Sequence, residues 1–352
     1  MKPLILTLLI VSTIGCTKPA ATVVAPSSPK VVEVTPSREV KFDSLGLTLQ
    51  GTLQLPEKTT GKVPAILLIP GSGPTDRNGN SGLGITTDLL KQIAEELAKN
   101  GIASLRFDKR AIAIYAAKWP KDMKQMSHYF RWESFVGDAS AGFDFLCQQP
   151  EIDAKRVGIL GHSEGALISL QIDSDRSGKP NSPKATILMG STGRPMGPIL
   201  HEQIARQLKK SRATADVTKK YLDYLDSACE ALKANKPIPP NIPSGLEALF
   251  NPSATEIMGA YCRINPTDLA KVALGPFLVM NGQKDTQVSA ERDTPPLLAT
   301  LRARKNGTVE SLIVPEASHN FKSTKGTSED AFTGPMVPEP LALIVKFARA
   351  NL

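Results

Sequence analysis

Short apolar runs alternate along this chain with segments that carry a single apolar stripe. Residues 65–69 are continuously apolar between two prolines, which is the pattern of a strand buried on both faces. Residues 88–98 then place apolar side chains at helical spacing, and Asn100-Gly101 ends that pattern. The same alternation continues through predicted strands at 102–107, 157–160, 185–189, 277–280 and 311–314, and through predicted helices at 133–146, 165–172 and 341–350.

Two further strands are predicted near the start of the folded part. Residues 40–49 and 52–55 have strand character, and we interpret them as a hairpin that turns at Gln50-Gly51. Together the patterns predict an α/β fold with a mainly parallel eight-stranded sheet and helices on both faces. The predicted domain extends over residues 39–352.

The alternation stops between residues 196 and 267. Two polar amphipathic helices are predicted at 201–208 and 217–234, and a proline-rich run follows at 236–243. We interpret this stretch as a lid insertion over the carboxyl ends of the strands, because ligands bind at that edge of such sheets. The alternative is a small separate domain that has no role in substrate binding.

The N-terminus has the features of a targeting segment. Lys2 precedes an apolar run over residues 4–14, which is too short to span a bilayer comfortably and is typical of a secretion signal. The run ends at Gly15-Cys16 and resembles a bacterial lipoprotein signal in which Cys16 is lipidated, although Thr13 stands where Leu is commonest. The alternative is an ordinary signal cleaved near residues 20–25.

Residues 17–38 are rich in Pro, Ala, Ser, Thr and Val, which predicts a flexible linker. With residues 1–16 as the signal, the chain is expected to be exported to a bacterial cell envelope or periplasm. Its expected membrane contact is limited to the lipid anchor.

Composition narrows the function classes. Hydrophobic residues make up 41% of the 352 residues and charged residues 22%, as in an ordinary globular protein. The net charge of +8 is spread along the chain without a basic stripe interleaved with aromatic residues, which argues against nucleic-acid binding. Neither a CxxC motif nor a histidine-rich cluster suggests a metal site. Cys147 is predicted to be a buried thiol, whereas Cys229 and Cys262 remain candidates for a disulfide.

The motif that carries most chemical information is Gly161-His162-Ser163-Glu164-Gly165. This G-x-S-x-G pattern lies directly after one predicted strand and directly before a predicted helix, which is the context that a nucleophilic serine requires. The two glycines allow a sharp turn that raises the serine hydroxyl out of the sheet. The sequence therefore predicts Ser163 as a nucleophile.

A serine hydroxyl needs a base within hydrogen-bond reach. Of the four histidines in the chain, His319 alone follows the last predicted strand on a loop at the carboxyl edge. His162 adjoins the serine and is expected to point away from it and pack, His128 lies in an irregular aromatic stretch, and His201 lies in the predicted lid. His319 is the predicted general base, and the alternative for it is an ordinary surface loop histidine.

The acid of such a site lies between the serine and the histidine in chain order. Asp285 follows the predicted strand at 277–280 and a short turn, where its carboxylate can orient the imidazole of His319. Asp293 is a reserve candidate in a predicted helix. Asp285 is the preferred acid.

Backbone amides are expected to hold the oxyanion that forms on the substrate. One is the N–H of Glu164 at the start of a helix, and the other comes from Pro70-Gly71-Ser72-Gly73 after the strand at 65–69. We assign the second donor to Ser72, with Gly73 as the alternative. A phosphate-binding loop is the rival interpretation, but this loop lacks the G-x-G-x-x-G order and a P-loop lysine.

Several segments, in order along the chain, resemble bacterial α/β-hydrolases of the serine-aminopeptidase-like esterase group. The resemblance extends from about residue 40 to the C-terminus and is weakest in the lid. It is carried by residues 70–80, 104–110, 161–165, 281–288 and 318–320.

The resemblance implies carboxylesterase activity on small or medium acyl esters, with peptidases among the relatives. It implies Ser163, Asp285 and His319 as the catalytic residues and Ser72 and Glu164 as the oxyanion donors. Relatives usually carry glycines where this chain has residues 111–114, Ala-Ile-Ala-Ile, so a different loop shape is expected there. Asp76, Arg77, Asp108 and Arg110 are expected to form an ion-pair network that braces the active-site loops.

The predicted reaction is hydrolysis of a small-molecule carboxylic ester through an acyl-enzyme, for which no metal or organic cofactor is expected. One alternative is peptide or amide hydrolysis by the same three side chains, which an acidic cluster in the lid would favour. The acidic residues of the helix predicted at 217–234 are Asp223, Asp226 and Glu230, which are scattered on its predicted solvated face. A second alternative is a lipid-anchored binding protein that has lost catalysis.

Overall fold

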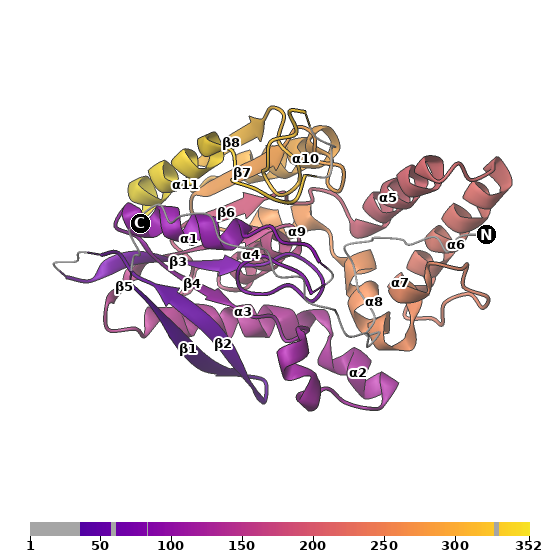
Figure 1. Cartoon of the computed structure of the whole chain (residues 1–352), viewed down its shortest axis with the longest axis horizontal. Helices are drawn as coiled ribbons and strands as arrows, with labels where there is room; N and C mark the ends of the chain where they lie inside the picture. Colours follow the sequence, from indigo (N-terminus) through magenta and orange to yellow (C-terminus); the bar gives the residue numbers. More distant parts are fainter. Residues whose placement is uncertain (1–35, 58–60, 83, 327–330) are drawn as a thin grey trace, which may run out of the picture.

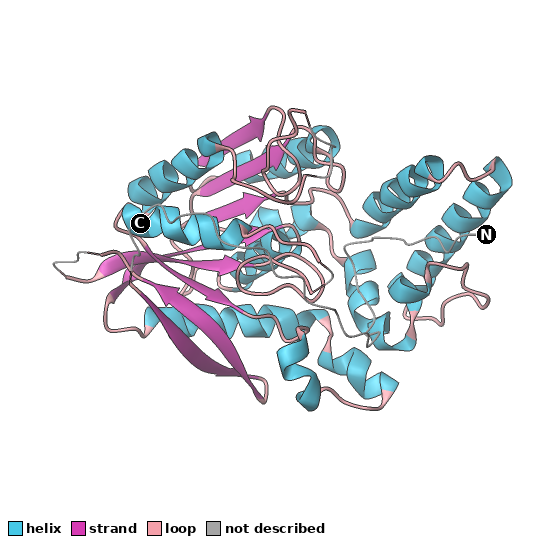
Figure 2. Cartoon of the chain, in the orientation of Figure 1, coloured by secondary structure: helices cyan, strands magenta, loops and turns pink. Residues whose placement is uncertain are grey.

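The computed structural model describes residues 36–57, 61–82, 84–326 and 331–352. The predicted signal peptide, Cys16 and nearly all of the predicted linker lie outside the described residues. The centre of the molecule is a twisted eight-stranded sheet in the order β1-β2-β4-β3-β5-β6-β7-β8 (Figures 1 and 2). The strands are β1 (Ser37–Ser44), β2 (Leu47–Gln54), β3 (Val63–Ile69), β4 (Ala103–Phe107), β5 (Ile152–His162), β6 (Thr186–Met189), β7 (Phe277–Gly282) and β8 (Val309–Val314).

The pairing of the strands confirms a mainly parallel sheet. β2 pairs antiparallel with β1 and with β4, and every pair from β4 through β3 to β8 is parallel. The central parallel strands β6 and β7 are buried along their whole length, as expected of strands that helices cover on both faces. β1 begins at Ser37, slightly before the predicted domain start at residue 39.

Successive side chains of β3 point into two different hydrophobic cores. Ile66 and Leu68 pack with the helices on one face, whereas Leu67 and Ile69 pack with those on the other. The first face is covered by α1 (Leu89–Lys99) and α11 (Pro338–Asn351). The second face is covered by α3 (Trp132–Cys147), α4 (Glu164–Asp175), α9 (Pro266–Val272) and α10 (Ala290–Arg302). Helices on both faces were predicted, and this arrangement confirms them.

The predicted position of the hairpin turn is wrong. The turn lies at Leu45-Gly46, where both residues have positive φ, 48° and 78°, as a tight hairpin turn requires. Leucine is an unusual residue for that conformation, so the pattern gave little indication of it. Gly51 instead lies inside β2, where a Cβ would come within 2.7 Å of the carbonyl oxygen of Arg106 on β4.

The predicted lid stretch forms a group of helices between β6 and β7, at the right of Figure 1. It comprises α5 (Met196–Lys210), α6 (Ala215–Lys233), α7 (Glu247–Phe250), the 3₁₀ helix η2 (Pro252–Ala254) and α8 (Thr255–Arg263). Among the described residues, no helix combines the length and the apolar character needed to cross a bilayer.

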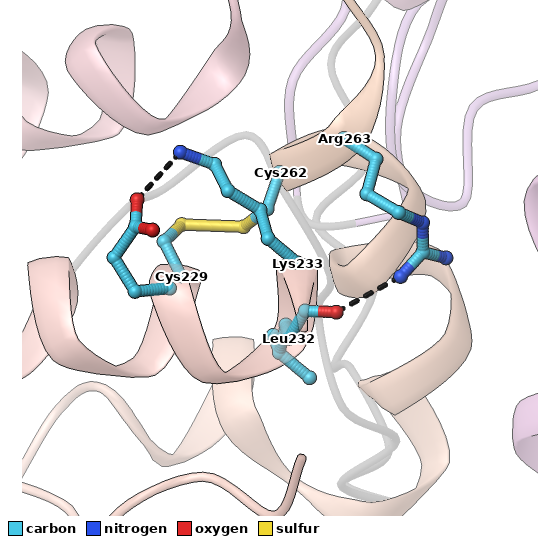
Figure 3. The surroundings of a disulfide bond; sticks show 6 residues. Cys229, Leu232, Lys233, Cys262 and Arg263 are labelled. Carbon is cyan, nitrogen blue, oxygen red and sulfur yellow. Dashed lines mark hydrogen bonds and ion pairs between the residues drawn. A yellow bond between two sulfur atoms is a disulfide. The ribbon is translucent and has the colours of Figure 1, made fainter. Parts of the chain in front are cut away.

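A disulfide joins two of the lid helices. Cys229 on α6 and Cys262 on α8 have Cα atoms 5.6 Å apart, and Figure 3 shows the bridge between the two helices. Beside it, Arg263 donates to the carbonyl oxygen of Leu232 at 2.9 Å. Cys147 is a free thiol, as predicted, but it is half-buried instead of fully buried, and burial raises its pKa to about 11.

The stretch between β4 and α3 folds into elements that no sequence pattern predicted. It contains the 3₁₀ helix η1 (Ala113–Lys118) and α2 (Met123–Tyr129), which lies against η2 and α8 of the lid. Aromatic contacts hold it, including Trp119 to Phe130 with ring centroids 5.7 Å apart. A segment this short does not show helical periodicity in its sequence, so its two helices are evident only from the structure.

Candidate active site

Ser163 occupies the sharp turn between β5 and α4. Its φ of 58° and ψ of −119° lie in a region that non-glycine residues rarely adopt, and its N–H donates to the carbonyl oxygen of Met189 at 2.8 Å. The flanking glycines are required: a Cβ on Gly161 would lie 1.9 Å from the carbonyl oxygen of Gly165, and a Cβ on Gly165 would lie 2.3 Å from that of Ile69. The turn has the strained geometry that the motif predicts.

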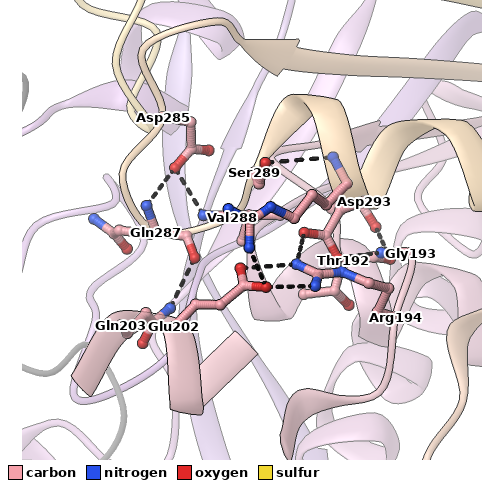
Figure 4. Close-up of polar contacts among 12 residues, drawn as sticks. Thr192, Gly193, Arg194, Glu202, Gln203, Asp285, Gln287, Val288, Ser289 and Asp293 are labelled. Atoms are coloured by element: carbon pink, nitrogen blue, oxygen red, sulfur yellow. Dashed lines mark hydrogen bonds and ion pairs between the residues drawn. The ribbon is translucent and has the colours of Figure 1, made fainter. Parts of the chain in front are cut away.

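His319 and Asp285 form a buried pair at the same edge of the sheet. Nδ1 of His319 lies 2.6 Å from Oδ2 of Asp285. The other carboxylate oxygen of Asp285 accepts hydrogen bonds from the N–H groups of Gln287 at 2.7 Å and Val288 at 2.9 Å (Figure 4). Both oxygens are therefore engaged, and the carboxylate is held facing the imidazole.

The remaining ring nitrogen of His319 is available for chemistry. Nε2 is buried and has no hydrogen-bond partner among the described residues. His319, Ser163 and Ser72 line one small cavity. Burying an imidazole nitrogen without a hydrogen-bond partner costs free energy. A nitrogen in this state is therefore a candidate for a role in substrate binding or proton transfer. The structure thus places Ser163 and His319 at one cavity, with Asp285 against the other nitrogen of the imidazole.

His162 has a second role that the sequence did not reveal. Its ring lies 4.7 Å from the ring of His319, and its Nε2 donates to the backbone carbonyl of His319 at 2.9 Å. Burial lowers the pKa of His162 to about 3, so the ring is neutral at ordinary pH. His162 therefore holds the loop that carries His319, whereas the sequence suggested packing alone. No local pattern signals this contact, because the two residues are far apart in the chain.

Asp293, the reserve acid, is engaged elsewhere. Its Oδ2 lies 2.8 Å from Nη2 of Arg194, and its Oδ1 accepts from the N–H of Gly193 at 3.1 Å. Arg194 also contacts Glu202 of α5 at 2.7 Å (Figure 4). Asp293 thus secures the start of the lid, and Asp285 faces the imidazole.

The predicted oxyanion donors border the nucleophile. Ser72, Ser163 and Glu164 line a second small cavity together with Met196 and Gln203 of the lid helix α5. Glu164 is the first residue of α4, where backbone N–H groups lack an acceptor within the helix. The Ser72 loop is braced internally, since the hydroxyl of Thr75 donates to the Ser72 carbonyl at 2.7 Å. The sequence assigned these residues through their amides, and that assignment stays a prediction.

The side chain of Glu164 has a function that the sequence did not indicate. Its Oε1 lies 2.6 Å from Nζ of Lys109, and its Oε2 accepts from the hydroxyl of Tyr261 on α8. Lys109 also donates to the carbonyl oxygen of Gly71 at 3.0 Å. Burial, followed by the Glu164 carboxylate, raises the pKa of Tyr261 well above its ordinary value, so the hydroxyl keeps its proton. Three segments of the site are tied together at this carboxylate.

The expected ion-pair network near the oxyanion loop is only partly present. Nε of Arg77 and Oδ2 of Asp108 lie 2.9 Å apart, while Arg110 pairs with Asp138 at 2.7 Å. Asp76 forms no part of either pair: its Oδ1 accepts from the N–H groups of Asn78 and Asn80, both at 2.8 Å. The prediction of one network is wrong, because Arg110 points toward α3 and Asp76 closes a turn of its own loop.

Among the described residues, no group of three or more His, Cys, Asp and Glu side chains is placed to hold a metal ion. The chemistry that the observed arrangement supports is proton transfer from Ser163 to His319 and stabilisation of an oxyanion by backbone amides.

No family model matches the chain. The chain is 28% identical over 280 residues to esterase EstD of Thermotoga maritima, an alignment that covers 80% of this chain and 60% of that protein. The chain thus spans about 60% of the length of the curated relative that it matches.

Solved structures share the fold. An esterase from Pyrococcus furiosus superposes with a TM-score of 0.56 at 17% identity, covering 94% of this chain and 97% of that one. An acylaminoacyl peptidase from Pyrococcus horikoshii gives a TM-score of 0.54 at 16% identity, covering 91% of this chain and 42% of that one. The chain therefore has the α/β-hydrolase fold.

Proposed function

We propose that this protein is a serine carboxylesterase that hydrolyses esters through an acyl-enzyme. The observation that carries the proposal is the 2.6 Å contact between His319 and Asp285 beside a cavity that His319 shares with Ser163. Such a pair exists to make an alcohol nucleophilic, and a strained serine at a strand-to-helix turn is the residue that needs it.

In the proposed first step, the Ser163 oxygen attacks the ester carbonyl while Nε2 of His319 accepts the hydroxyl proton. Asp285 stabilises the imidazolium, and the amides of Ser72 and Glu164 hold the oxyanion. His319 then protonates the departing alcohol. Water repeats the sequence and releases the acid, so that Ser163 recovers its proton.

The test uses the purified protein with p-nitrophenyl esters, aminoacyl amides and a fluorophosphonate probe. We expect ester hydrolysis to exceed amide hydrolysis, and we expect Ser163→Ala to abolish labelling and lower kcat by several orders of magnitude without loss of fold. Ser177→Ala is the matched control, because Ser177 lines neither of the two cavities that contain Ser163, and this variant should behave as the native protein. Labelling that persists in Ser163→Ala would contradict the nucleophile assignment.

We also propose that the protein is exported and anchored through a lipid on Cys16. The apolar run that ends at Cys16 supports this, as does the Cys229–Cys262 disulfide, because disulfides persist mainly in oxidising compartments. Expression of Cys16→Ser in a bacterial host should move the protein from the membrane fraction to the soluble fraction. An unchanged membrane fraction would rule out the anchor.

A further inference from the structure

A cavity of about 290 Å³ lies beside the proposed catalytic centre. One wall comes from the segment between β4 and α3, with Trp119, Met126 and Phe130, and the opposite wall comes from Ile257 on the lid helix α8. Glu164, the residue directly after the nucleophile, lines both this cavity and the small cavity that contains Ser163. The large cavity is therefore adjacent to the position of a bound ester.

The only charged lining residues of this cavity, among the described residues, are already paired. Lys109 and Glu164 contact each other at 2.6 Å, and each side chain is only 4% exposed. The hydroxyl of Tyr261 occupies the second oxygen of Glu164, and the ammonium of Lys109 lies 4.6 Å from the ring centroid of Phe135. A charged ligand group would have to displace one of these buried partners, which is costly. The rest of the lining is predominantly apolar.

The size of the cavity sets the size of its ligand. A cavity of about 150 Å³ accepts benzene in a protein core, so 290 Å³ accommodates a larger group such as a substituted phenyl ring or a medium-length alkyl chain. Met123 and Met126 lie on the wall, and the flexible thioether side chains of methionine adapt to groups of different shape.

The position of His319, which protonates the departing alcohol, indicates where each half of the ester lies. The departing alcohol must lie next to His319, which lines a different cavity together with Ser163. The acyl group stays bound through both chemical steps, and a roomy apolar site suits the group that stays. The 290 Å³ cavity adjoins the small cavity that contains Ser163 at Glu164 and Tyr261, which line both, and His319 lines neither of the two.

We propose that this cavity is the acyl-binding site and that it selects an uncharged, bulky apolar acyl group, either aromatic or of medium chain length. The inference rests on the proposed esterase activity and adds the substrate class to it. A free ammonium beside the scissile carbonyl is disfavoured, because the Glu164 carboxylate that could bind it is already paired with Lys109 and accepts a hydrogen bond from Tyr261. Selection against a free amine separates this site from that of an aminopeptidase.

The experiment measures kcat/KM for p-nitrophenyl acetate, octanoate and benzoate in the native protein and in two variants that fill the cavity. Ile257→Trp fills it from the lid wall and Met126→Trp from the opposite wall. Each should reduce the octanoate-to-acetate and benzoate-to-acetate ratios by about tenfold or more, because hydrophobic pockets discriminate steeply by size. Ile114→Trp is the matched control: Ile114 is 56% exposed on η1 and outside the cavity lining, and its ratios should stay within about twofold of native.

The results distinguish a failure of the acyl-site proposal from a failure of the proposed esterase function. Unchanged ratios in both filled variants, with native melting temperatures, would overturn the acyl-site assignment while leaving the esterase intact. If Ile257→Trp does not fold, Met126→Trp decides. A second arm compares the p-nitrophenyl esters of alanine and N-acetylalanine, and a native protein that prefers the free amine would also overturn the proposal. Absence of ester hydrolysis and of fluorophosphonate labelling would instead remove the proposed function, and the acyl site with it.

Discussion

The carboxyl edge of the sheet and the lid are held in different ways. At the sheet edge, Asp285 is held by two backbone N–H groups, and the backbone carbonyl of His319 is held by His162. In the lid, many ion pairs are exposed, such as Lys219 with Asp223 on α6, and such pairs contribute little. The lid relies on apolar packing and on one disulfide. The residues of the proposed chemistry are thus held by backbone hydrogen bonds, whereas the helices beside the proposed substrate pocket are held by side-chain packing and a covalent bridge.

The largest effect is expected at the rigid edge. Asp285→Asn should lower kcat by about 10³–10⁴-fold, because the amide cannot hold the required imidazole tautomer or stabilise the imidazolium. Asp293→Asn is the matched control, since that carboxylate pairs with Arg194 and should affect lid stability more than kcat. Steady-state kinetics with one p-nitrophenyl ester compares the two variants. A larger loss of kcat in Asp293→Asn would reverse the assignment of the acid.

Breaking the disulfide probes the lid. The double variant Cys229→Ala with Cys262→Ala should lower the free energy of unfolding by about 3–4 kcal/mol, from the chain entropy of the 33-residue separation. Thermal and denaturant unfolding measure the loss, and Cys147→Ala at the free thiol is the control. We expect fluorophosphonate labelling of the double variant to persist below its melting temperature, because the hydrogen bonds that hold Ser163, Asp285 and His319 involve neither cysteine. Simultaneous loss of labelling would show that the two regions are one unit.

A smaller effect concerns pH. The pKa of His162 falls from 6.5 to about 3 on burial, so between these values the unfolded chain binds a proton that the folded protein does not. The contribution of His162 to the free energy of unfolding is full above pH 6.5. It falls by about 2 kcal/mol between pH 7 and pH 5. His162→Gln should remove that slope, while His201→Gln in the lid should retain it.

The measurement is denaturant unfolding at several pH values, taken as the difference between variant and native protein. The difference matters because Asp173 acts in the opposite direction: burial raises its pKa to about 6, so the folded protein gains stability as the pH falls toward 4. That contribution is common to all three proteins and cancels. An unaltered slope in His162→Gln would contradict the buried neutral imidazole.

Much of the sheet and of the candidate site could be predicted because local patterns carry it. Continuous apolar runs identify strands that are buried on both faces, and the glycines around Ser163 identify a turn that no larger residue permits. His319 and Asp285 follow from the order of strands, since loops after parallel strands meet at one edge. The hairpin turn at Leu45-Gly46 was missed because its first residue is atypical for a positive φ.

Local patterns in the amino acids predict the alternation of strands and helices, the strained turn at Ser163 and the places of the proposed acid and base in the chain. Their surroundings follow from how the chain packs: the support of His319 by His162, the pairing of Glu164 with Lys109 and Tyr261, and the cavity between α2 and α8. The difference arises from the distance over which each kind of interaction acts along the chain. Periodicity and turn chemistry act over a few neighbouring residues, whereas these contacts join side chains that are separated by tens to more than a hundred positions and meet only when the helices pack.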